Sequence, residues 1–388
     1  ALLAQGAVMG ELAGWERPNW FAYNGESCYR YSYGKPNWFD ACQQECDAIK
    51  NHVAVFDQSS YPIYLVSGPE ALACLQYVSA NNINVAINQI VYSQWLNADA
   101  GIEADVTITR TGVSEFMVVS ACASERRDEF WLRKHADAFD CEVGNASDLV
   151  ILGLMGPKST ALLQTVLDQP EALGDLAYYR SAQFTAGAVS MRANRLSYVG
   201  ELGYELYVAQ SQMLNLYQRL LTKADQFNLR PAGFHAMNAC RMEKGYRHWG
   251  HDIHDHISPL QAGLGFAVTK TQDGYLGQVQ IDAQRGRQTR RLVNLAVQLD
   301  GNHPEEPPFM IHDEPIYRDG VRVGLTTSAA WGHRTHMSLA IAELVNEEGV
   351  DAAWLNSGHF EVEVAMRRYP IRVQLAPFYD PKSLLMKS

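Results

Sequence analysis

The chain of 388 residues is long enough for two or three domains, and its 47% apolar and 19% charged residues are ordinary for a soluble globular protein. A formal net charge of −11 argues against a nucleic-acid binder, because neutralising phosphates requires clustered Lys and Arg. The chain has no run of 18 apolar residues, which argues against a membrane span. Any acidic ligand would therefore have to be held by local arginines.

The seven cysteines are scattered and odd in number, so they predict no disulfide framework and favour a reducing compartment, the cytoplasm. Cys42 and Cys46 lie four residues apart in a helix predicted over residues 36–50. No second Cys or His pair follows at the spacing of a zinc site. We interpret both as small buried hydrophobes.

The first half of the chain contains a short internal repeat. Residues 66–76 (VSGPEALACLQ) and 154–164 (LMGPKSTALLQ) share the order strand, Gly-Pro, helix, Leu-Gln. This pattern predicts two similar α+β units in tandem, with chance similarity over a short window as the alternative. Residues 53–66 predict two strands around a turn, and 105–109 and 116–120 alternate as strands do.

Residues 91–110 (VYSQWLNADAGIEADVTITR) run into a turn and out into β-branched residues. The pattern places Asp105 at the start of a strand. An aspartate at such a position is usually a solvated turn residue, and that alternative stays open here.

Residues 194–208 (NRLSYVGELGYELYV) alternate aromatic, glycine and carboxylate residues. They predict a hairpin with strands at 196–199 and 204–208 and a turn from Gly200 to Gly203. Glu205 and Tyr207 then share one face, where a carboxylate and an aromatic ring could meet a flat ligand. The alternative is a surface hairpin whose glutamates face water.

Residues 233–253 (GFHAMNACRMEKGYRHWGHDI) predict a helix that ends near Gly245 and carries Arg241. A purely structural role for Arg241 is the alternative to a functional one, in an ion pair with Glu243 or Glu205. Four histidines crowd together after this helix, but their spacing is not that of a helical ligand pair, and we expect no metal site. The histidines are His248, His251, His254 and His256.

The last third begins with Gly263-Leu264-Gly265, which completes no dinucleotide-binding fingerprint. Residues 284–291 (QRGRQTRR) form a basic stretch, by default a solvated hinge. Six short strands are predicted beyond it, which favours a small closed or sandwiched β domain. The strands span residues 292–299, 314–317, 321–327, 339–344, 360–364 and 371–374.

The segments 194–208, 101–105 (GIEAD) and 233–253 resemble the glycine-cleavage aminomethyltransferase (T-protein) family. GAVMGELAGWERPNWF near the start is similar to the junction after the flavin domain of dimethylglycine and sarcosine dehydrogenases, whose C-terminal half is T-protein-like. The resemblance covers nearly the whole chain. It implies an α+β fold with two related α/β folate-binding units of antiparallel sheets, arranged as a cloverleaf with a C-terminal β barrel. The implied segments are a junction (1–35), a folate-binding region of two interleaved units (36–283) and the barrel (290–388).

The resemblance also implies a function. We expect a tetrahydrofolate-dependent aminomethyltransferase that captures a one-carbon unit from an N-methyl amine, such as dimethylglycine or sarcosine, as 5,10-methylenetetrahydrofolate. The expected partners are that small amine or its iminium and an FAD-dependent oxidoreductase domain or subunit. A tetrahydrofolate-dependent O- or S-demethylase and a non-catalytic folate-binding module are the alternatives.

The resemblance assigns roles to five residues, and Tyr207 joins them because it shares a strand face with Glu205. Asp105 is the catalytic residue, although T-proteins commonly show two adjacent acids where this chain has Ala104 and Asp105, which leaves Glu103 as the spare base. The carboxylate of Glu205 suits the paired N–H donors of a pterin, because it can accept two hydrogen bonds side by side. In the basic stretch, a patch for a polyglutamate tail is the minor alternative. The expected tetrahydrofolate-binding residues are Tyr198, Glu205, Tyr207 and Phe266 around the pterin and Arg241 at the glutamate end.

Overall fold

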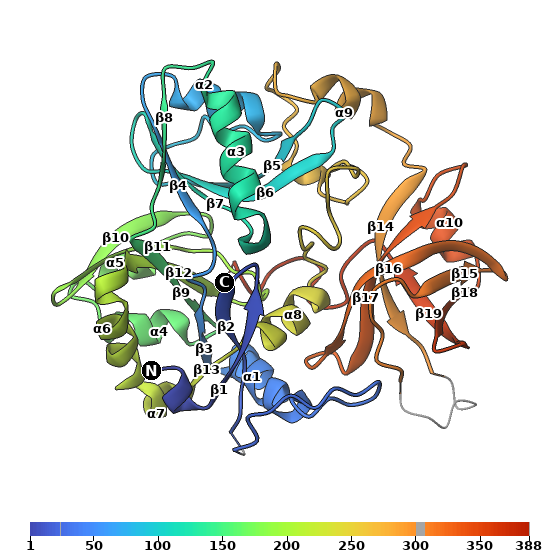
Figure 1. Cartoon of the computed structure of the whole chain (residues 1–388), viewed down its shortest axis with the longest axis horizontal. Helices are drawn as coiled ribbons and strands as arrows, with labels where there is room; N and C mark the ends of the chain where they lie inside the picture. The colour runs from blue at the N-terminus through green and yellow to red at the C-terminus, as the bar shows by residue number, and fades with distance from the viewer. Residues whose placement is uncertain (24, 300–306, 388) are drawn as a thin grey trace.

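The computed structural model describes residues 1–23, 25–299 and 307–387 and shows three lobes around a common centre (Figure 1). The chain opens with a hairpin of β1 (Ala7–Leu12) and β2 (Trp15–Phe21) after a short turn, η1 (Leu3–Gln5). Helix α1 (Phe39–Asn51) follows. It confirms the helix predicted there, and Cys42 and Cys46 are buried in it, as predicted.

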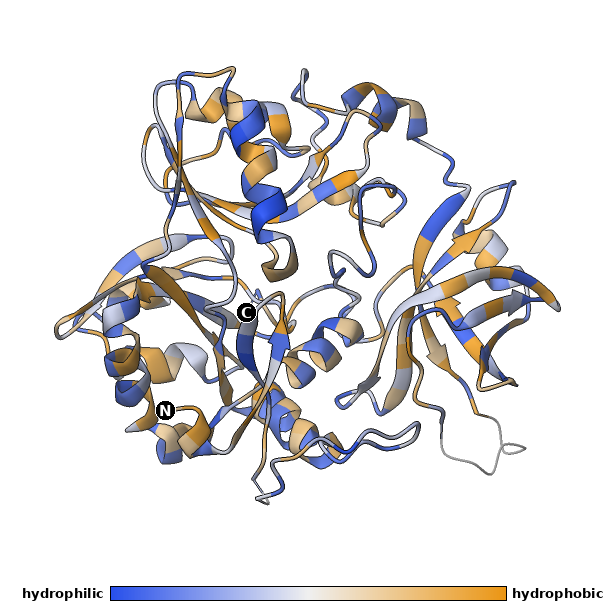
Figure 2. Ribbon diagram, viewed as in Figure 1, coloured by the Kyte–Doolittle hydropathy of each residue, from blue (hydrophilic) through white to orange (hydrophobic). Residues whose placement is uncertain are grey.

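The first lobe is a five-stranded antiparallel sheet in the order β5-β6-β7-β4-β8. Two helices, α2 and α3, cover one face, and α3 is banded with hydrophobic and hydrophilic residues (Figure 2). Trp95 and Phe116 fill the core between sheet and helices. The elements are β4 (Ile63–Ser67), α2 (Ala71–Val78), β5 (Ile90–Leu96), β6 (Ile102–Arg110), β7 (Glu115–Val119), η2 (Cys122–Ser124), α3 (Glu125–Ala136) and β8 (Glu142–Asn145).

The second lobe is a six-stranded sheet in the order β10-β11-β12-β9-β3-β13. Its strands are antiparallel except for β13, which pairs with β3 in parallel. Strand β3 precedes the whole first lobe in the chain, so the two units are interleaved. The elements are β3 (Val53–Asp57), β9 (Leu149–Met155), α4 (Ser159–Gln164), α5 (Glu171–Gly174), β10 (Ser181–Ala186), β11 (Val189–Asn194), β12 (Gly203–Ala209), α6 (Gln210–Leu221), α7 (Ala224–Phe227) and β13 (Leu229–Pro231).

The internal repeat corresponds to the same local structure in both lobes. Strand β4 turns through Gly68 into α2, and β9 turns through Gly156 into α4. Both glycines have φ of +127°, and a Cβ at either would lie under 3 Å from a backbone oxygen. Only glycine tolerates such a turn. The Gly-Pro pattern therefore marks a repeated strand-to-helix turn.

The predicted hairpin of residues 196–208 is wrong in its first half. Strand β12 is present, but residues 195–202 form a loop, and the antiparallel neighbour of β12 is β11. Two contacts hold this loop against the rest of the molecule: the Tyr198 hydroxyl donates to the backbone oxygen of Arg247, and Glu201 accepts from Arg334. Local alternation could not distinguish this loop from a strand.

The third lobe is a closed barrel in the order β14-β17-β16-β15-β18-β19, and α8, at the centre of the view, packs between it and the second lobe (Figure 1). The predicted small β domain is confirmed, and β16 and β17 extend beyond their predicted ends toward α8. No helix of the described residues is long and apolar enough to cross a bilayer. The elements are α8 (Phe234–Glu243), η3 (Gly265–Ala267), α9 (Gln278–Gln284), β14 (Arg290–Val297), β15 (Pro315–Arg318), β16 (Val321–Gly332), β17 (Met337–Val345), α10 (Ala352–Ser357), β18 (Phe360–Val364) and β19 (Arg367–Gln374).

Candidate functional site

Glu205 and Tyr207 lie two residues apart on β12 and share one face of the strand, as predicted. The Tyr207 hydroxyl donates a hydrogen bond of 2.6 Å to Glu205 Oε2. Asn194 of β11 lies directly across the sheet from Glu205. The Glu205 side chain is buried, and burial raises its carboxyl pKa to about 7. No arginine or lysine neutralises this carboxylate through any contact that the described residues make.

Asp105 lies in the middle of β6, because the strand begins at Ile102. The expectation of a strand start at Asp105 was wrong. Glu103 can lie inside the strand because Arg127 neutralises its charge and Asn97 donates a hydrogen bond to it. Across the sheet, Gln94 Nε2 donates a hydrogen bond of 2.9 Å to Asp105 Oδ1. Burial raises the carboxyl pKa of Asp105 to about 6.

The two acids belong to different lobes, and the lobes meet beside them. Asn194 of β11 donates a hydrogen bond of 3.0 Å from Nδ2 to Thr109 Oγ1 of β6. Burial raises the pKa of the Tyr179 hydroxyl, and the negative charges of both Asp105 and Glu205 raise it further. Tyr179 therefore lies within electrostatic reach of both carboxylates. Sequence reasoning missed Tyr179, although a tyrosine just before an alternating strand could have been noted.

Tyr198 lies in the loop before β12, and Phe266 lies in the short helix η3. The Tyr198 hydroxyl donates to the backbone oxygen of Arg247 at 2.8 Å, and its ring stacks on Tyr246. Phe266 is 75% exposed and stacks on Tyr92, with ring centroids 6.1 Å apart. Tyr92 in turn interacts through its hydroxyl with the Asp105 carboxylate. Aromatic faces thus line the approach to Asp105.

The ion-pair partner of Arg241 is neither of the two acids that the sequence suggested. Its Nη1 donates to Asp252 Oδ2 at 2.8 Å, not to Glu243 or Glu205, and Nε donates to Asn238. The side chain is 3% exposed. Asp252 also accepts from Thr327 and Ser328 of the barrel, so Arg241 contributes to the junction between α8 and the barrel.

The site is rich in acceptors without partners. Gln94 Oε1 and Asn194 Oδ1 are buried and accept no hydrogen bond from the residues that the structure describes. Together with the two carboxylates they favour a flat ligand that presents several N–H donors, since a buried acceptor left without a partner costs free energy. A pterin has such an edge, so the residues present fit tetrahydrofolate.

The histidines form no metal centre in the described part of the chain. His248 and His251 stack on each other with centroids 4.9 Å apart. Within residues 1–23, 25–299 and 307–387, no group of three or more His, Cys, Asp or Glu side chains is arranged to hold a metal ion.

The raised pKa of Glu205 predicts a pH-dependent cost to stability. Because the folded state holds this proton more tightly than the unfolded state, stability is lost as the pH rises from about 4.5 to about 7. We expect Glu205→Gln to raise the free energy of unfolding by about 1–3 kcal/mol at pH 8 and to leave it unchanged at pH 4. Urea unfolding at both pH values measures this, and an equal effect at both would contradict it.

Two family models cover most of the chain. Residues 1–272 match the GCVT N-terminal domain, and residues 290–380 match the glycine cleavage T-protein C-terminal barrel domain. The crystal structure of the glycine cleavage system aminomethyltransferase T of Bartonella henselae superposes with a TM-score of 0.82 over 98% of this chain and 96% of that chain. At 23% sequence identity, this similarity shows the fold.

The chain spans less than half the length of several curated proteins that it matches. The 4-methylaminobutanoate oxidase (formaldehyde-forming) of Paenarthrobacter nicotinovorans is 38% identical over 97% of this chain and 45% of its own length. The mitochondrial dimethylglycine dehydrogenase of Mus musculus is 30% identical over 95% of this chain and 42% of its own length. The chain thus spans less than half of these relatives. The sequence matches and the three-lobed fold together show that the chain belongs to the folate-dependent glycine-cleavage T-protein family.

Proposed function

We propose that the chain is a tetrahydrofolate-dependent aminomethyltransferase that captures the one-carbon unit of an oxidised N-methyl amine as 5,10-methylenetetrahydrofolate. The observation that carries this proposal is a pair of carboxylates, the half-buried Asp105 and the buried Glu205, on neighbouring sheets beside unsatisfied acceptors. Dimethylglycine and sarcosine represent the class of amine, and 4-methylaminobutanoate fits the same class. Family membership and the names of the similar oxidase and dehydrogenase support it.

The residues divide the work between binding and proton transfer. Glu205 accepts the paired N–H donors of the pterin, while Tyr198, Tyr207 and Phe266 pack around its ring and Arg241 braces the pocket through Asp252. Tetrahydrofolate supplies two nitrogens, N5 and N10, that together bond one carbon. Asp105 accepts a proton that these nitrogens lose as the carbon is bonded, and its pKa of about 6 leaves it ionised at neutral pH.

The reaction balances without an oxidant in this chain. The iminium carbon passes to the two folate nitrogens, which lose two protons. One proton is transferred to the amine nitrogen as the amine leaves, and the other passes by way of Asp105 to solvent. Holding the two reactants together makes the capture effectively unimolecular and limits free formaldehyde. We propose that the preceding oxidation of the N-methyl group takes place on a flavin-dependent domain or subunit, as the names and lengths of the relatives suggest.

Calorimetry with folinic acid on Glu205→Ala tests the binding role. We expect binding to weaken about 10- to 100-fold, because a hydrogen bond to a charged group contributes about 1.5–3 kcal/mol. The exposed Glu347→Ala is the matched control and should bind like the wild type. Retained affinity in Glu205→Ala would remove Glu205 from the folate site.

A further inference from the structure

Arg17 is a cation without an acidic partner. It lies half-buried in β2, which packs against α8 near the centre of the molecule (Figure 1). Among the described residues, Arg17 forms no hydrogen bond or ion pair, and no carboxylate acts on its pKa, which burial lowers. Its guanidinium carbon lies 3.8 Å from the centroid of the Phe234 ring. A cation taken partly out of water is normally compensated by an acid, so we expect an anionic ligand beside it.

Tyr61 connects Arg17 to the candidate site. It packs against two groups of buried side chains, one that contains Phe234 and one that contains Tyr207. Burial raises the pKa of the Tyr61 hydroxyl to about 12. The positive charge of Arg17 lowers this pKa and the negative charge of Glu205 raises it further, so both charges act on the same hydroxyl. Arg17 therefore lies near the end of the site that is assigned to the pterin.

The Ser60 hydroxyl belongs to the same neighbourhood. Ser60 and Arg17 both lie close enough to the Cys122 thiol to lower its pKa, which burial raises. Ser60 is 4% exposed, and its Oγ makes no hydrogen bond to any residue that the structure describes. A carboxylate accepts hydrogen bonds from a guanidinium and from a hydroxyl. It is therefore the kind of anion that suits these two groups.

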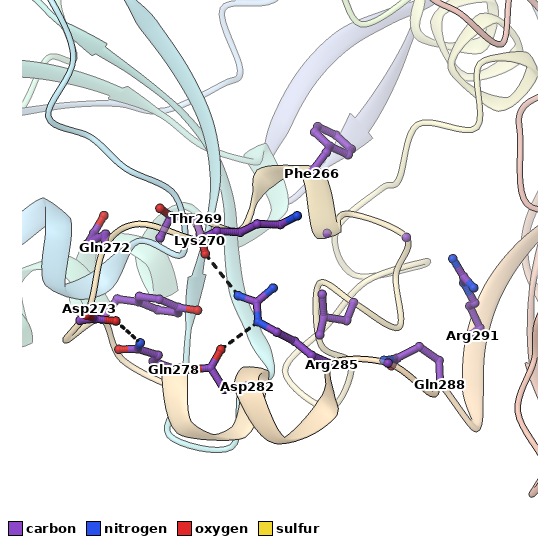
Figure 3. Close-up of a pocket in the computed structure, with 15 residues that line it drawn as sticks. Phe266, Thr269, Lys270, Gln272, Asp273, Gln278, Asp282, Arg285, Gln288 and Arg291 are labelled. Carbon is purple, nitrogen blue, oxygen red and sulfur yellow. Dashed lines mark hydrogen bonds and ion pairs between the residues drawn. The ribbon is translucent and has the colours of Figure 1, made fainter.

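The carboxylates of a folate do not suit this position. They are carried by the glutamate, at the opposite end of the molecule from the pterin ring. A cavity of about 780 Å³ between η3, α9 and the start of β14 has Phe266 at its upper rim, and no residue of β2 or α8 lines it (Figure 3). Arg17 is therefore no part of that cavity. With the pterin at Glu205, the anion beside Arg17 has to come from the other reactant, the amine.

We propose that Arg17 binds the carboxylate of the amine that delivers the one-carbon unit, so that the chain selects N-methyl amino acids over amines without an acid. The proposal rests on the proposed function, because it takes the pterin to lie at Glu205 and a second reactant to lie beside it. Arg17 takes no part in proton transfer. Holding the carboxylate fixes the amine beside the folate nitrogens, which makes Arg17 a specificity-determining residue.

Calorimetry with sarcosine on the protein loaded with folinic acid tests the proposal. Folinic acid already carries a formyl group on N5, so no transfer follows binding. N-methylethanolamine, which has a hydroxyl group in place of the carboxylate, is the matched ligand. We expect sarcosine to bind on the order of tenfold more tightly than N-methylethanolamine, the size of a hydrogen-bonded charge pair.

Variants of Arg17 show whether this preference depends on its guanidinium. In Arg17→Met the two amines should bind within about twofold of each other. Arg17→Lys should keep part of the preference, because it keeps the charge without the planar fork of donors. Arg322→Met, which changes an exposed arginine of the barrel, is the matched control and should keep the whole preference.

The outcomes separate this proposal from the proposed function. Equal binding of the two amines to the wild type overturns the role of Arg17. Weaker binding of folinic acid in Arg17→Met, with the preference for sarcosine retained, assigns Arg17 to the folate and also overturns it. If the wild type binds no folinic acid, the proposed function fails instead. Sarcosine is then titrated against the protein alone, where a preference that Arg17→Met loses supports the carboxylate site and its absence overturns it.

Discussion

Asp105→Asn is expected to slow the formation of 5,10-methylenetetrahydrofolate by about 10²- to 10⁴-fold, the usual contribution of a positioned general base. An amide cannot accept the proton that a folate nitrogen loses. The geometry should survive the change, because Gln94 Nε2 can still donate to the remaining oxygen at this position. Folate affinity should therefore change much less than the rate.

The measurement follows methylene-folate formation from tetrahydrofolate and formaldehyde, or from a flavin-domain partner, between pH 5 and 8. The wild-type rate should rise through about pH 6 as Asp105 ionises and then level off, and the variant should lose this step. Asp148→Asn, an exposed aspartate, serves as the control. Equal rates in Asp105→Asn would remove Asp105 from the mechanism.

The same assay distinguishes the other possible activities by their products. A 5-methyl product would indicate transfer of an intact methyl group. A wild-type rate no higher than the spontaneous condensation would indicate a folate-binding module without catalysis. Each result is visible in the identity or the rate of the product, independent of the effect of Asp105→Asn.

Much of the fold could be predicted because its signals are local. The barrel strands alternate hydrophobic and polar residues, and the Gly68 and Gly156 turns carry a dipeptide with a specific backbone requirement. The pairing of Glu205 with Tyr207 also follows from the period of two residues along a strand. The division of the chain at residues 1–35, 36–283 and 290–388 stays a prediction.

The parts that failed depend on contacts between distant segments. Arg241 pairs with Asp252, eleven residues further along the chain, whereas the sequence suggested Glu243 or Glu205 as its partner. Arg127, which lies in α3, neutralises Glu103, and β6 therefore begins before Glu103 and not at Asp105 as predicted. Alternation cannot reveal such pairs, because burial and charge compensation decide them only after the lobes have docked.

Arg334 is the clearest residue of this kind, and sequence analysis assigned it no role. It lies in the turn between β16 and β17, and its side chain is fully buried beside two carboxylates. Its guanidinium donates to Glu243 Oε2 at 2.5 Å and to Glu201 Oε1 at 2.8 Å, and it lies 4.1 Å from the centroid of the Tyr379 ring. It also donates to the Val199 backbone oxygen at 2.9 Å. One side chain thus joins the barrel, α8 and the loop that leads into β12.

Arg334→Met is expected to lower the free energy of unfolding by about 3–5 kcal/mol, because it leaves two buried carboxylates without their cation. Urea unfolding at pH 7 measures the loss, with the exposed Arg322→Met as the control of the same chemistry. Adding Glu243→Met to Arg334→Met should recover part of the loss, since the uncompensated charge and not the missing contact area is then removed. A loss below about 1 kcal/mol in Arg334→Met, or no recovery in the double variant, would show that the barrel is held to the other two lobes by apolar packing instead.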